Sequence, residues 1–147
     1  MDNKGRCIEI LLIEDNPADI RLTKEIFKEA KINNNLNVVE NGLEALEYLR
    51  KSSNYKNATK PDIIVLDLNM PKMDGREFLA KVKFDENFKR IPVIVLTTSE
   101  SEEDILRTYD LLANCYITKP VDLDEFIKVV KFIEEFWLNI VKLPKVG

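Results

Sequence analysis

The chain has 147 residues, of which 45% are hydrophobic, and this suits one compact domain with a full apolar core. Its 22 basic and 26 acidic residues give a net charge of −4, and no run of Lys and Arg is long enough to follow a nucleic-acid backbone. No histidine occurs, which excludes an imidazole base, a histidine metal ligand and a phosphohistidine. Because no segment has the character of a membrane span or a signal peptide, we expect a cytoplasmic protein.

Two cysteines occur, Cys7 and Cys115, and each lies at the start of an apolar segment. They are far apart in the sequence and lack the paired spacing of zinc or redox motifs. Because we expect a reducing compartment, we predict two buried thiols, and a disulfide or a shared ligand role is the less favoured alternative.

Five short apolar segments alternate with longer segments of helical period along the chain. The apolar segments cover residues 8–13, 36–39, 63–66, 93–96 and 116–118. Their alternation with helical segments is typical of an α/β fold with a parallel sheet and helices on both faces. The first, third and fourth segments are rich in Ile, Leu and Val, which predicts central strands, and the more polar second segment predicts an edge strand.

Helix starts are recognisable between these segments. Asn16 can cap a helix whose first residue is Pro17, and Ser99 with Glu102 has the spacing of a capping box. Further helices are predicted over residues 42–50, 75–84 and 122–142. The polar composition of residues 52–60 predicts a loop.

Polar side chains lie at the ends of four of the predicted strands. Glu14 and Asp15 follow the first strand, Asp67 ends the third, Thr97 ends the fourth, and Lys119 follows the fifth. In an open parallel sheet, ligands bind at the carboxyl ends of the strands. One carboxylate at such a place is often only a helix cap. Three carboxylates from two strands, together with a hydroxyl and a lysine, instead indicate a functional site.

This polar cluster favours phosphoryl chemistry with a metal ion. Close carboxylates repel one another unless a cation lies between them, so they predict a hard metal ion bound by oxygen, for which Mg²⁺ fits best. Asp67 is the natural nucleophile, because a carboxylate can form an acyl phosphate while the cation and Lys119 offset the charge of the transferring group. Thr97 can donate a hydrogen bond to that group. Taken alone, Lys119 would be interpreted as a surface charge, and only the carboxylates favour its functional role.

Four segments, in order and at matching spacing, resemble the receiver domain of two-component response regulators over essentially the whole chain. They are residues 13–16 (IEDN), 65–71 with 73–75 (VLDLNMP and MDG), 93–97 (VIVLT) and 116–120 (YITKP). The resemblance implies the flavodoxin-like fold of chemotaxis receivers, a five-stranded parallel sheet with strand order 2-1-3-4-5. It also implies a sensor histidine kinase as the phosphoryl donor.

Carried over residue by residue, the resemblance assigns Asp67 as the phosphoacceptor. It implies that Glu14, Asp15 and Asp67 hold Mg²⁺ together with the backbone carbonyl of Asn69. It also implies that Lys119 contacts the phosphoryl group and that a cis peptide bond follows this lysine.

The resemblance further implies a switch pair formed by Thr97 and Tyr116. The hydroxyl of Thr97 would move towards the phosphoryl group while the ring of Tyr116 turns inward. From its position alone, Tyr116 would be interpreted as a strand aromatic packed against a helix.

Two features bear on the place of the chain within this family. Leu112 stands where such domains usually carry glycine, which predicts an unusual end to the preceding helix. The loop over residues 52–60 and the tail over residues 136–144 resemble the small receivers that partner phytochrome-type sensor kinases.

We expect a single receiver domain over residues 1–147, with a C-terminal helix extension and tail at about 136–147. No output domain is expected after the last helix, so output would come through protein contacts. In that helix the residues with core period are Leu123, Phe126, Ile127, Val130, Ile133, Trp137 and Ile140, and a second stripe comprises Val129, Phe132 and Phe136. The second stripe predicts a homodimer through this helix and tail, and the alternative is a monomer whose tail covers it.

The leading hypothesis is therefore a stand-alone response regulator, a phosphoacceptor switch with slow self-catalysed phosphotransfer and dephosphorylation, and not a metabolic enzyme. A phosphohydrolase that forms an aspartyl phosphate is a rival, but such enzymes characteristically carry a second aspartate where this chain has Asn69. A degenerate receiver that serves only as a scaffold is a third possibility. It would be expected to lack an acid, the acceptor or the lysine, and none is missing.

Overall fold

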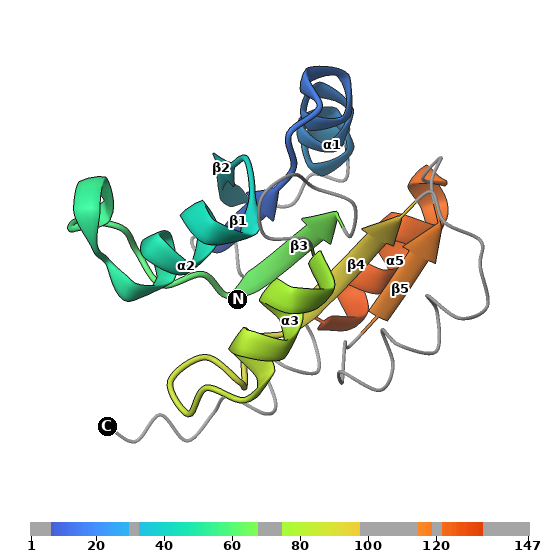
Figure 1. Cartoon of the computed structure of the whole chain (residues 1–147). Coiled ribbons are helices and arrows are strands. Elements are labelled where there is room, and N and C mark those ends of the chain that lie inside the picture. The colour runs from blue at the N-terminus through green and yellow to red at the C-terminus, as the bar shows by residue number, and fades with distance from the viewer. Residues whose placement is uncertain (1–6, 30–32, 68–74, 98–114, 119–121, 134–147) are drawn as a thin grey trace.

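The computed structural model describes residues 7–29, 33–67, 75–97, 115–118 and 122–133. Within these residues one parallel sheet has the strand order β2-β1-β3-β4-β5, which confirms the predicted topology (Figure 1). The strands are β1 (Ile8–Ile13), β2 (Asn34–Val39), β3 (Ile63–Asp67), β4 (Val93–Thr97) and β5 (Cys115–Thr118). The predicted strand ends differ from these by at most two residues, and the polar second strand lies at an edge of the sheet, as predicted.

Helices cover both faces of this sheet. They are α1 (Pro17–Glu29), α2 (Gly42–Arg50), α3 (Gly75–Lys83) and α5 (Leu123–Ile133). Helices α2 and α3 pack on one face and α1 and α5 on the other (Figure 1). The helix predicted after Ser99 and Glu102, the position of Leu112 and the predicted continuation of the last helix beyond 133 lie outside the described residues. No described helix is both long enough and apolar enough to span a membrane.

Side-chain caps start the first two helices directly after their strands. Asn16 Oδ1 accepts hydrogen bonds from the backbone N–H groups of Ala18 (2.8 Å) and Asp19 (3.1 Å), as its position before Pro17 predicts. Asn41 Oδ1 accepts one from Glu44 N–H at 2.9 Å, and Glu44 Oε1 accepts one from Glu40 N–H at 3.0 Å. These caps turn the chain sharply at the carboxyl ends of β1 and β2.

The core has two layers, one on each face of the sheet. Strands β1, β3 and β4 contribute buried side chains to both layers, as their continuous apolar composition predicts. On the α1 and α5 side, Phe27 and Phe126 meet edge to face with ring centroids 5.2 Å apart. Both rings are fully buried, so they tie α1 to α5.

The prediction for α5 needs one correction. Phe126 is buried as predicted. Val129, a residue of the second stripe, and Ile127, predicted to be a core residue, are both half-buried, and of these two it is Val129 that packs against the core. The reason is helical geometry, because a residue three positions on lies about 60° around the helix from Phe126, whereas the next residue lies about 100° away.

Two further expectations are modified. The loop over residues 52–60 contains a short 3₁₀ helix, η1 (Ser53–Tyr55), and its Tyr55 and Ala58 pack against the core, so the loop is anchored. Cys7 is a free thiol but half-buried, since it precedes the first core residue of β1. The side chain of Cys115 lies outside the description.

An acidic candidate site at the carboxyl edge of the sheet

The register of the central strands brings the predicted acidic residues together. Ile13 of β1 lies opposite Leu66 of β3, so the next residues on the two strands, Glu14 and Asp67, meet at the carboxyl edge of the sheet. On its other side, Asp67 lies opposite Leu96 of β4. Asp67 therefore occupies the middle position of this edge, where groups from two neighbouring strands are within reach.

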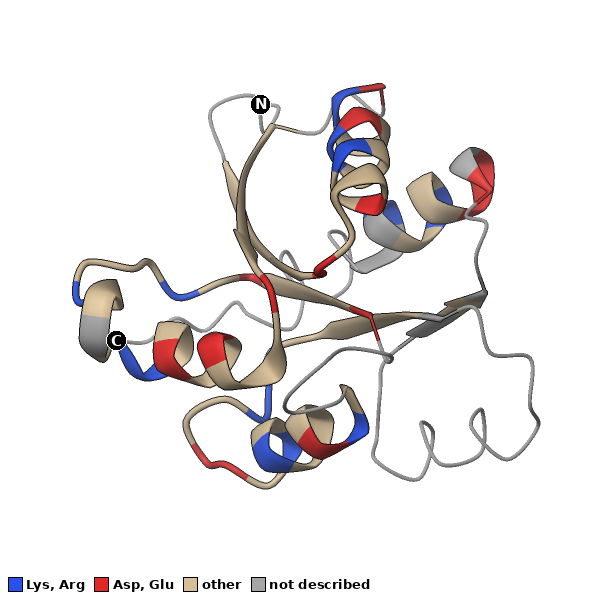
Figure 2. Ribbon diagram, turned by 45° about the horizontal axis from the view of Figure 1, so that its top comes forward, with Lys and Arg blue, Asp and Glu red and all other residues tan. Residues whose placement is uncertain are grey.

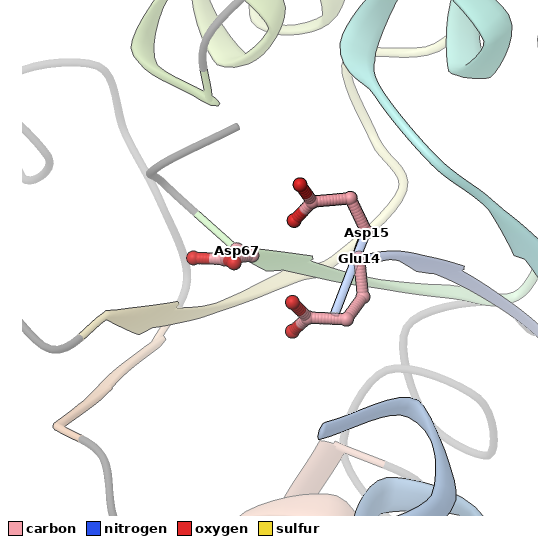
Figure 3. Close-up of side chains that lie close together, drawn as sticks. All are labelled: Glu14, Asp15 and Asp67. Carbon is pink, nitrogen blue, oxygen red and sulfur yellow. The ribbon is translucent and has the colours of Figure 1, made fainter. Parts of the chain in front are cut away.

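Three carboxylates form the centre of the site. Glu14, Asp15 and Asp67 each offer one oxygen, and these oxygens all lie within 4.8 Å of one another. In Figure 3 the side chains of Glu14 and Asp15 extend from either side of the strand end towards the space beside Asp67. Figure 2 shows the corresponding acidic segments at the ends of neighbouring strands near the middle of the molecule. The prediction that these residues gather at one edge is confirmed.

The three carboxylates differ in their exposure to solvent. Glu14 and Asp67 are 1% and 6% exposed, whereas Asp15 is exposed. Glu14 Oε2 accepts a hydrogen bond from the backbone N–H of Asn16 at 3.3 Å. Burial of two carboxylates so close together is costly in free energy unless positive charge or hydrogen bonds compensate for it. The site therefore combines two enclosed acids with one that faces water.

This donor set fits a hard divalent cation. Oxygen ligands about 2.1 Å from Mg²⁺ are separated by roughly 3 Å when adjacent and roughly 4.2 Å when opposite. The observed separations of up to 4.8 Å need only small side-chain rotations to reach these values. Three carboxylates from one side of an octahedron would leave the remaining positions to water and to a bound oxyanion.

The other predicted site residues are only partly described. Thr97 is the last residue of β4 and lies opposite Thr118 of β5, so its backbone is at the same edge as Asp67. The backbone of Tyr116 lies within β5. The side chains of Thr97 and Tyr116 lie outside the description, as do Asn69, Lys119 and the predicted cis peptide bond after Lys119.

One contribution to the site was missed from the sequence. Asn16 was predicted only as a helix cap, but it serves twice, because its side chain starts α1 while its backbone N–H holds Glu14. The available signal was the position of this residue, two places after Glu14 and directly before the proline that begins the helix. The turn thus orients a metal-ligating candidate and the helix start together.

Comparison with known proteins agrees with this geometry. The response regulator receiver domain model matches residues 10–131. The chain is 47% identical over 135 residues to the response regulator Rcp1 of Synechocystis sp., covering 92% of each protein. It is 36% identical to a probable methanogenesis regulatory protein, FilR2, of Methanothrix harundinacea, over 92% of this chain and 86% of that one.

Solved structures that are similar to this chain include those of two response regulators. One is the phosphorylated cyanobacterial phytochrome response regulator RcpA, with a TM-score of 0.78 and 51% identity over 90% of this chain and 95% of that chain. Another is the Mn²⁺-bound form of Rcp1, with a TM-score of 0.77 and 46% identity over 90% and 96% of the two chains. The sheet order, the acidic edge and these similarities together show that the chain belongs to the response regulator receiver domain family of two-component signal transduction.

Proposed function

We propose that this protein is a stand-alone phosphoacceptor switch in which Asp67 receives a phosphoryl group beside a bound Mg²⁺. The observation that carries the proposal is the convergence of three carboxylate oxygens within 4.8 Å at the carboxyl edge of the sheet. Glu14, Asp15 and Asp67 would hold the ion, with the backbone carbonyl of Asn69 as a further ligand. The bound ion would offset the charge of the incoming phosphoryl group.

The position of Asp67 supports its assignment as the acceptor. Its strand is flanked by β1, which carries the other two acids, and by β4, which ends at Thr97. A phosphoryl group on Asp67 would therefore lie between the acidic cluster and the end of β4. Neither Glu14 nor Asp15, which follow the neighbouring strand, has this central position.

The transfer is a simple displacement at phosphorus. A carboxylate oxygen of Asp67 attacks the phosphorus of a phosphohistidine on the donor, the P–O bond forms, and the P–N bond breaks. The departing imidazole takes up a proton. Hydrolysis resets the switch: water attacks the phosphorus of the acyl phosphate, and the products are inorganic phosphate and the free Asp67 carboxylate. We propose that both steps are slow relative to those of a metabolic enzyme.

Three further residues complete the proposed machinery. Lys119 would contact the phosphoryl oxygens, and the hydroxyl of Thr97 would donate a hydrogen bond to them. Tyr116 would turn inward as Thr97 moves, so that the state of Asp67 changes the surface around β4 and β5. The placement of the Thr97 backbone at the same edge as Asp67 supports this proposal.

The proposed donor is a sensor histidine kinase of the phytochrome type. Receiver domains take their phosphoryl group from histidine kinases, and the relatives RcpA and Rcp1 support the narrower choice. We propose that the chain is one domain over residues 1–147, acts in the cytoplasm and signals through protein contacts. We also propose that it forms a homodimer through the C-terminal helix and a tail at about 136–147.

The phosphoacceptor is tested by intact-mass spectrometry after incubation with acetyl phosphate and Mg²⁺. The wild type should gain the mass of one phosphoryl group, and Asp67→Asn should gain none. Asp85→Asn is a matched control, because Asp85 lies between α3 and the start of β4, and the acidic site lies at the carboxyl ends of the strands. Absence of the mass gain on the wild type would overturn the proposal in favour of a scaffold. Rapid multiple turnover of the donor would instead favour a phosphohydrolase.

Recognition of the kinase is tested separately from the chemistry. Helix α1 starts beside the acidic site and exposes Leu22, which is 46% exposed. Leu22→Glu should slow phosphotransfer from a phytochrome-type kinase but leave phosphorylation by acetyl phosphate unchanged. Phe84→Glu, on a residue 76% exposed beyond the far end of α3, is the control and should affect neither reaction. Equal loss with both donors would show that Leu22 acts on the site and not on docking.

The oligomeric state is tested by sedimentation at micromolar concentration, with and without a phosphoryl mimic. The expected result is a dimer. A monomer under both conditions would exclude the proposed homodimer without affecting the phosphoacceptor.

A further inference from the structure

Strand β2 forms an edge of the sheet, and its own sequence lacks the residues that usually protect such an edge. It spans Asn34–Val39 and pairs only with β1 among the described residues. Its sequence, NNLNVV, contains no charged residue and no proline. Natural proteins usually protect a long edge strand with Lys, Pro or a bulge, because the free backbone groups otherwise pair with another strand. Within the described part of the chain, no second strand occupies the outer side of β2.

The hydrogen-bond pattern identifies which backbone groups of β2 face away from β1. The N–H groups of Ile8 and Glu14 donate to the carbonyls of Asn33 and Val39, both at 3.0 Å. In a parallel ladder these inward bonds recur at every second residue of β2. Leu36 and Val38 lie between these bonded residues and consequently direct their N–H and C=O groups away from β1. A partner strand would meet two donors and two acceptors there.

One side of this edge is basic. A cavity of about 380 Å³ lies between α1 and β2 and is lined by Lys24, Lys28, Asn33, Asn34 and Leu36. The two lysines lie one turn apart on α1, and both are exposed. Neither ammonium group forms an ion pair with a carboxylate of the described chain. Their like charges favour a ligand that brings negative charge to this side of β2.

The other side of the edge is uncharged along most of its length and partly aromatic. A cavity of about 480 Å³ is formed there by β2, α2 and the loop that contains η1. Its lining includes Asn37, Tyr48, Tyr55 and one acid, Glu9, whose Oε2 accepts a hydrogen bond from Asn35 Nδ2 at 2.8 Å. The two tyrosine rings lie 5.4 Å apart at an interplanar angle of 56° and anchor the loop. This arrangement suits uncharged side chains that combine an apolar surface with a hydrogen-bonding group.

We propose that β2 binds an extended segment of a partner protein that adds a strand to the sheet. Successive side chains of such a segment point to opposite faces. Carboxylates at every second position would reach Lys24 and Lys28, and the intervening polar or aromatic side chains would enter the cavity beside Tyr48 and Tyr55. Main-chain hydrogen bonds supply affinity in this mode of recognition, and the flanking cavities supply specificity.

Charge decides between this partner and a second copy of the chain. If two copies of β2 paired in antiparallel fashion in one continuous sheet, their α1 helices would lie on the same face. Lys24 and Lys28 of one copy would then approach the same lysines of the other copy, which is unfavourable. An acidic extended segment meets the same lysines with opposite charge. Binding of such a segment at β2 depends on neither Asp67 nor its phosphorylation.

The test uses two short synthetic peptides with blocked ends. In one, Glu alternates with Thr and Tyr, and in the other, Lys replaces every Glu. Amide NMR of the wild type should show that only the Glu peptide binds and that it slows hydrogen exchange at Leu36 and Val38. The amides of Asn35 and Asn37, already bonded to β1, should change less. Lys24→Glu combined with Lys28→Glu should weaken the Glu peptide about tenfold and allow the Lys peptide to bind.

Several outcomes would overturn the inference. These are no binding of the Glu peptide, equal binding of both peptides, or protection of amides outside β2. A Glu peptide with N-methylated backbone amides cannot add a strand. If it bound as tightly as the unmodified Glu peptide, the interaction would be simple charge attraction, and the proposed strand addition would be overturned. Dimerisation of the wild type through β2 would replace the proposed partner with a second copy. Phosphorylation of the double variant by acetyl phosphate should be unchanged, which confirms that it folds.

Discussion

Replacement of Asp15 by asparagine tests the electrostatic reasoning about the acidic site. Asp15 is exposed and contributes one of three carboxylate oxygens that lie within 4.8 Å of one another. The substitution keeps the size of the side chain and removes one negative charge. Without metal, it relieves repulsion with Glu14 and Asp67, so we expect the folded state to become more stable.

The size of this effect follows from the separation of the charges. Two unit charges 4.8 Å apart in water repel by about 0.9 kcal/mol. Salt at physiological strength, with a screening length of about 8 Å, reduces this to about half. Because Asp15 has two acidic neighbours, Asp15→Asn should raise the free energy of unfolding by about 1 kcal/mol. In saturating Mg²⁺ the wild type should instead be the more stable of the two proteins. Mg²⁺ at about 100 times its Kd stabilises the wild type by roughly 2.7 kcal/mol, and it stabilises the variant by less because one ligand is lost.

The assay is urea unfolding of both proteins in EDTA and in Mg²⁺. Glu25→Gln provides the matched control, because Glu25 is exposed on α1 and is not part of the acidic cluster. It should change neither the stability in EDTA nor the increment caused by Mg²⁺. A lower stability of Asp15→Asn than of the wild type in EDTA, or equal stabilisation of the two proteins by Mg²⁺, would refute the predicted repulsion at the acidic site.

Three further predictions, on Lys51, Lys83 and Phe126, test other parts of the structure. Lys51 ends α2 with φ of 57°, so Lys51→Gly should stabilise by about 1 kcal/mol in urea unfolding, and Lys51→Ala, which cannot relieve the left-handed strain, should not. Burial lowers the pKa of Lys83 to about 8, so the unfolded chain holds this proton more tightly and the stability should rise as pH increases from about 8 towards 10.5. That rise in stability should reach about 1–2 kcal/mol by pH 9.5 after allowance for solvent screening, and Lys83→Met should abolish it. The same pH profile in the wild type and in Lys83→Met would contradict the lowered pKa of Lys83. Phe126→Ala should cost about 3–5 kcal/mol in thermal or urea unfolding, because it opens a cavity beside Phe27, whereas the exposed Leu43→Ala should change stability by less than about 0.5 kcal/mol.

Prediction from sequence succeeded best where one local signal was sufficient. The continuous apolar composition of β1, β3 and β4 identified the central strands, and the pair Asn16-Pro17 identified the start of α1. The acidic site could also be predicted, because parallel strands bring their carboxyl ends to one edge whatever the details of packing. Glu14, Asp15 and Asp67 lie together for that reason.

The errors arose where a neighbour in space decided the outcome. The faces of α5 were assigned from its own periodicity, but the position of Phe27 on α1 determines that Phe126 and then Val129 face the core. The loop at residues 52–60 looked polar in composition, yet Tyr55 packs against Tyr48 because α2 lies beside it. A single sequence contains no direct signal for such contacts.

The order of apolar and helical segments was enough to establish the α/β class, the edge position of β2 and the identity of the acidic residues, because strand burial and helix capping are local properties of the chain. Packing between elements decided the remaining features. It set the 4.8 Å spacing of the three carboxylates, gave Glu14 and Asp67 a burial that Asp15 does not share, and left β2 between a basic and an aromatic cavity. Each of these depends on how residues far apart in the chain are held against one another, and no local pattern specifies that.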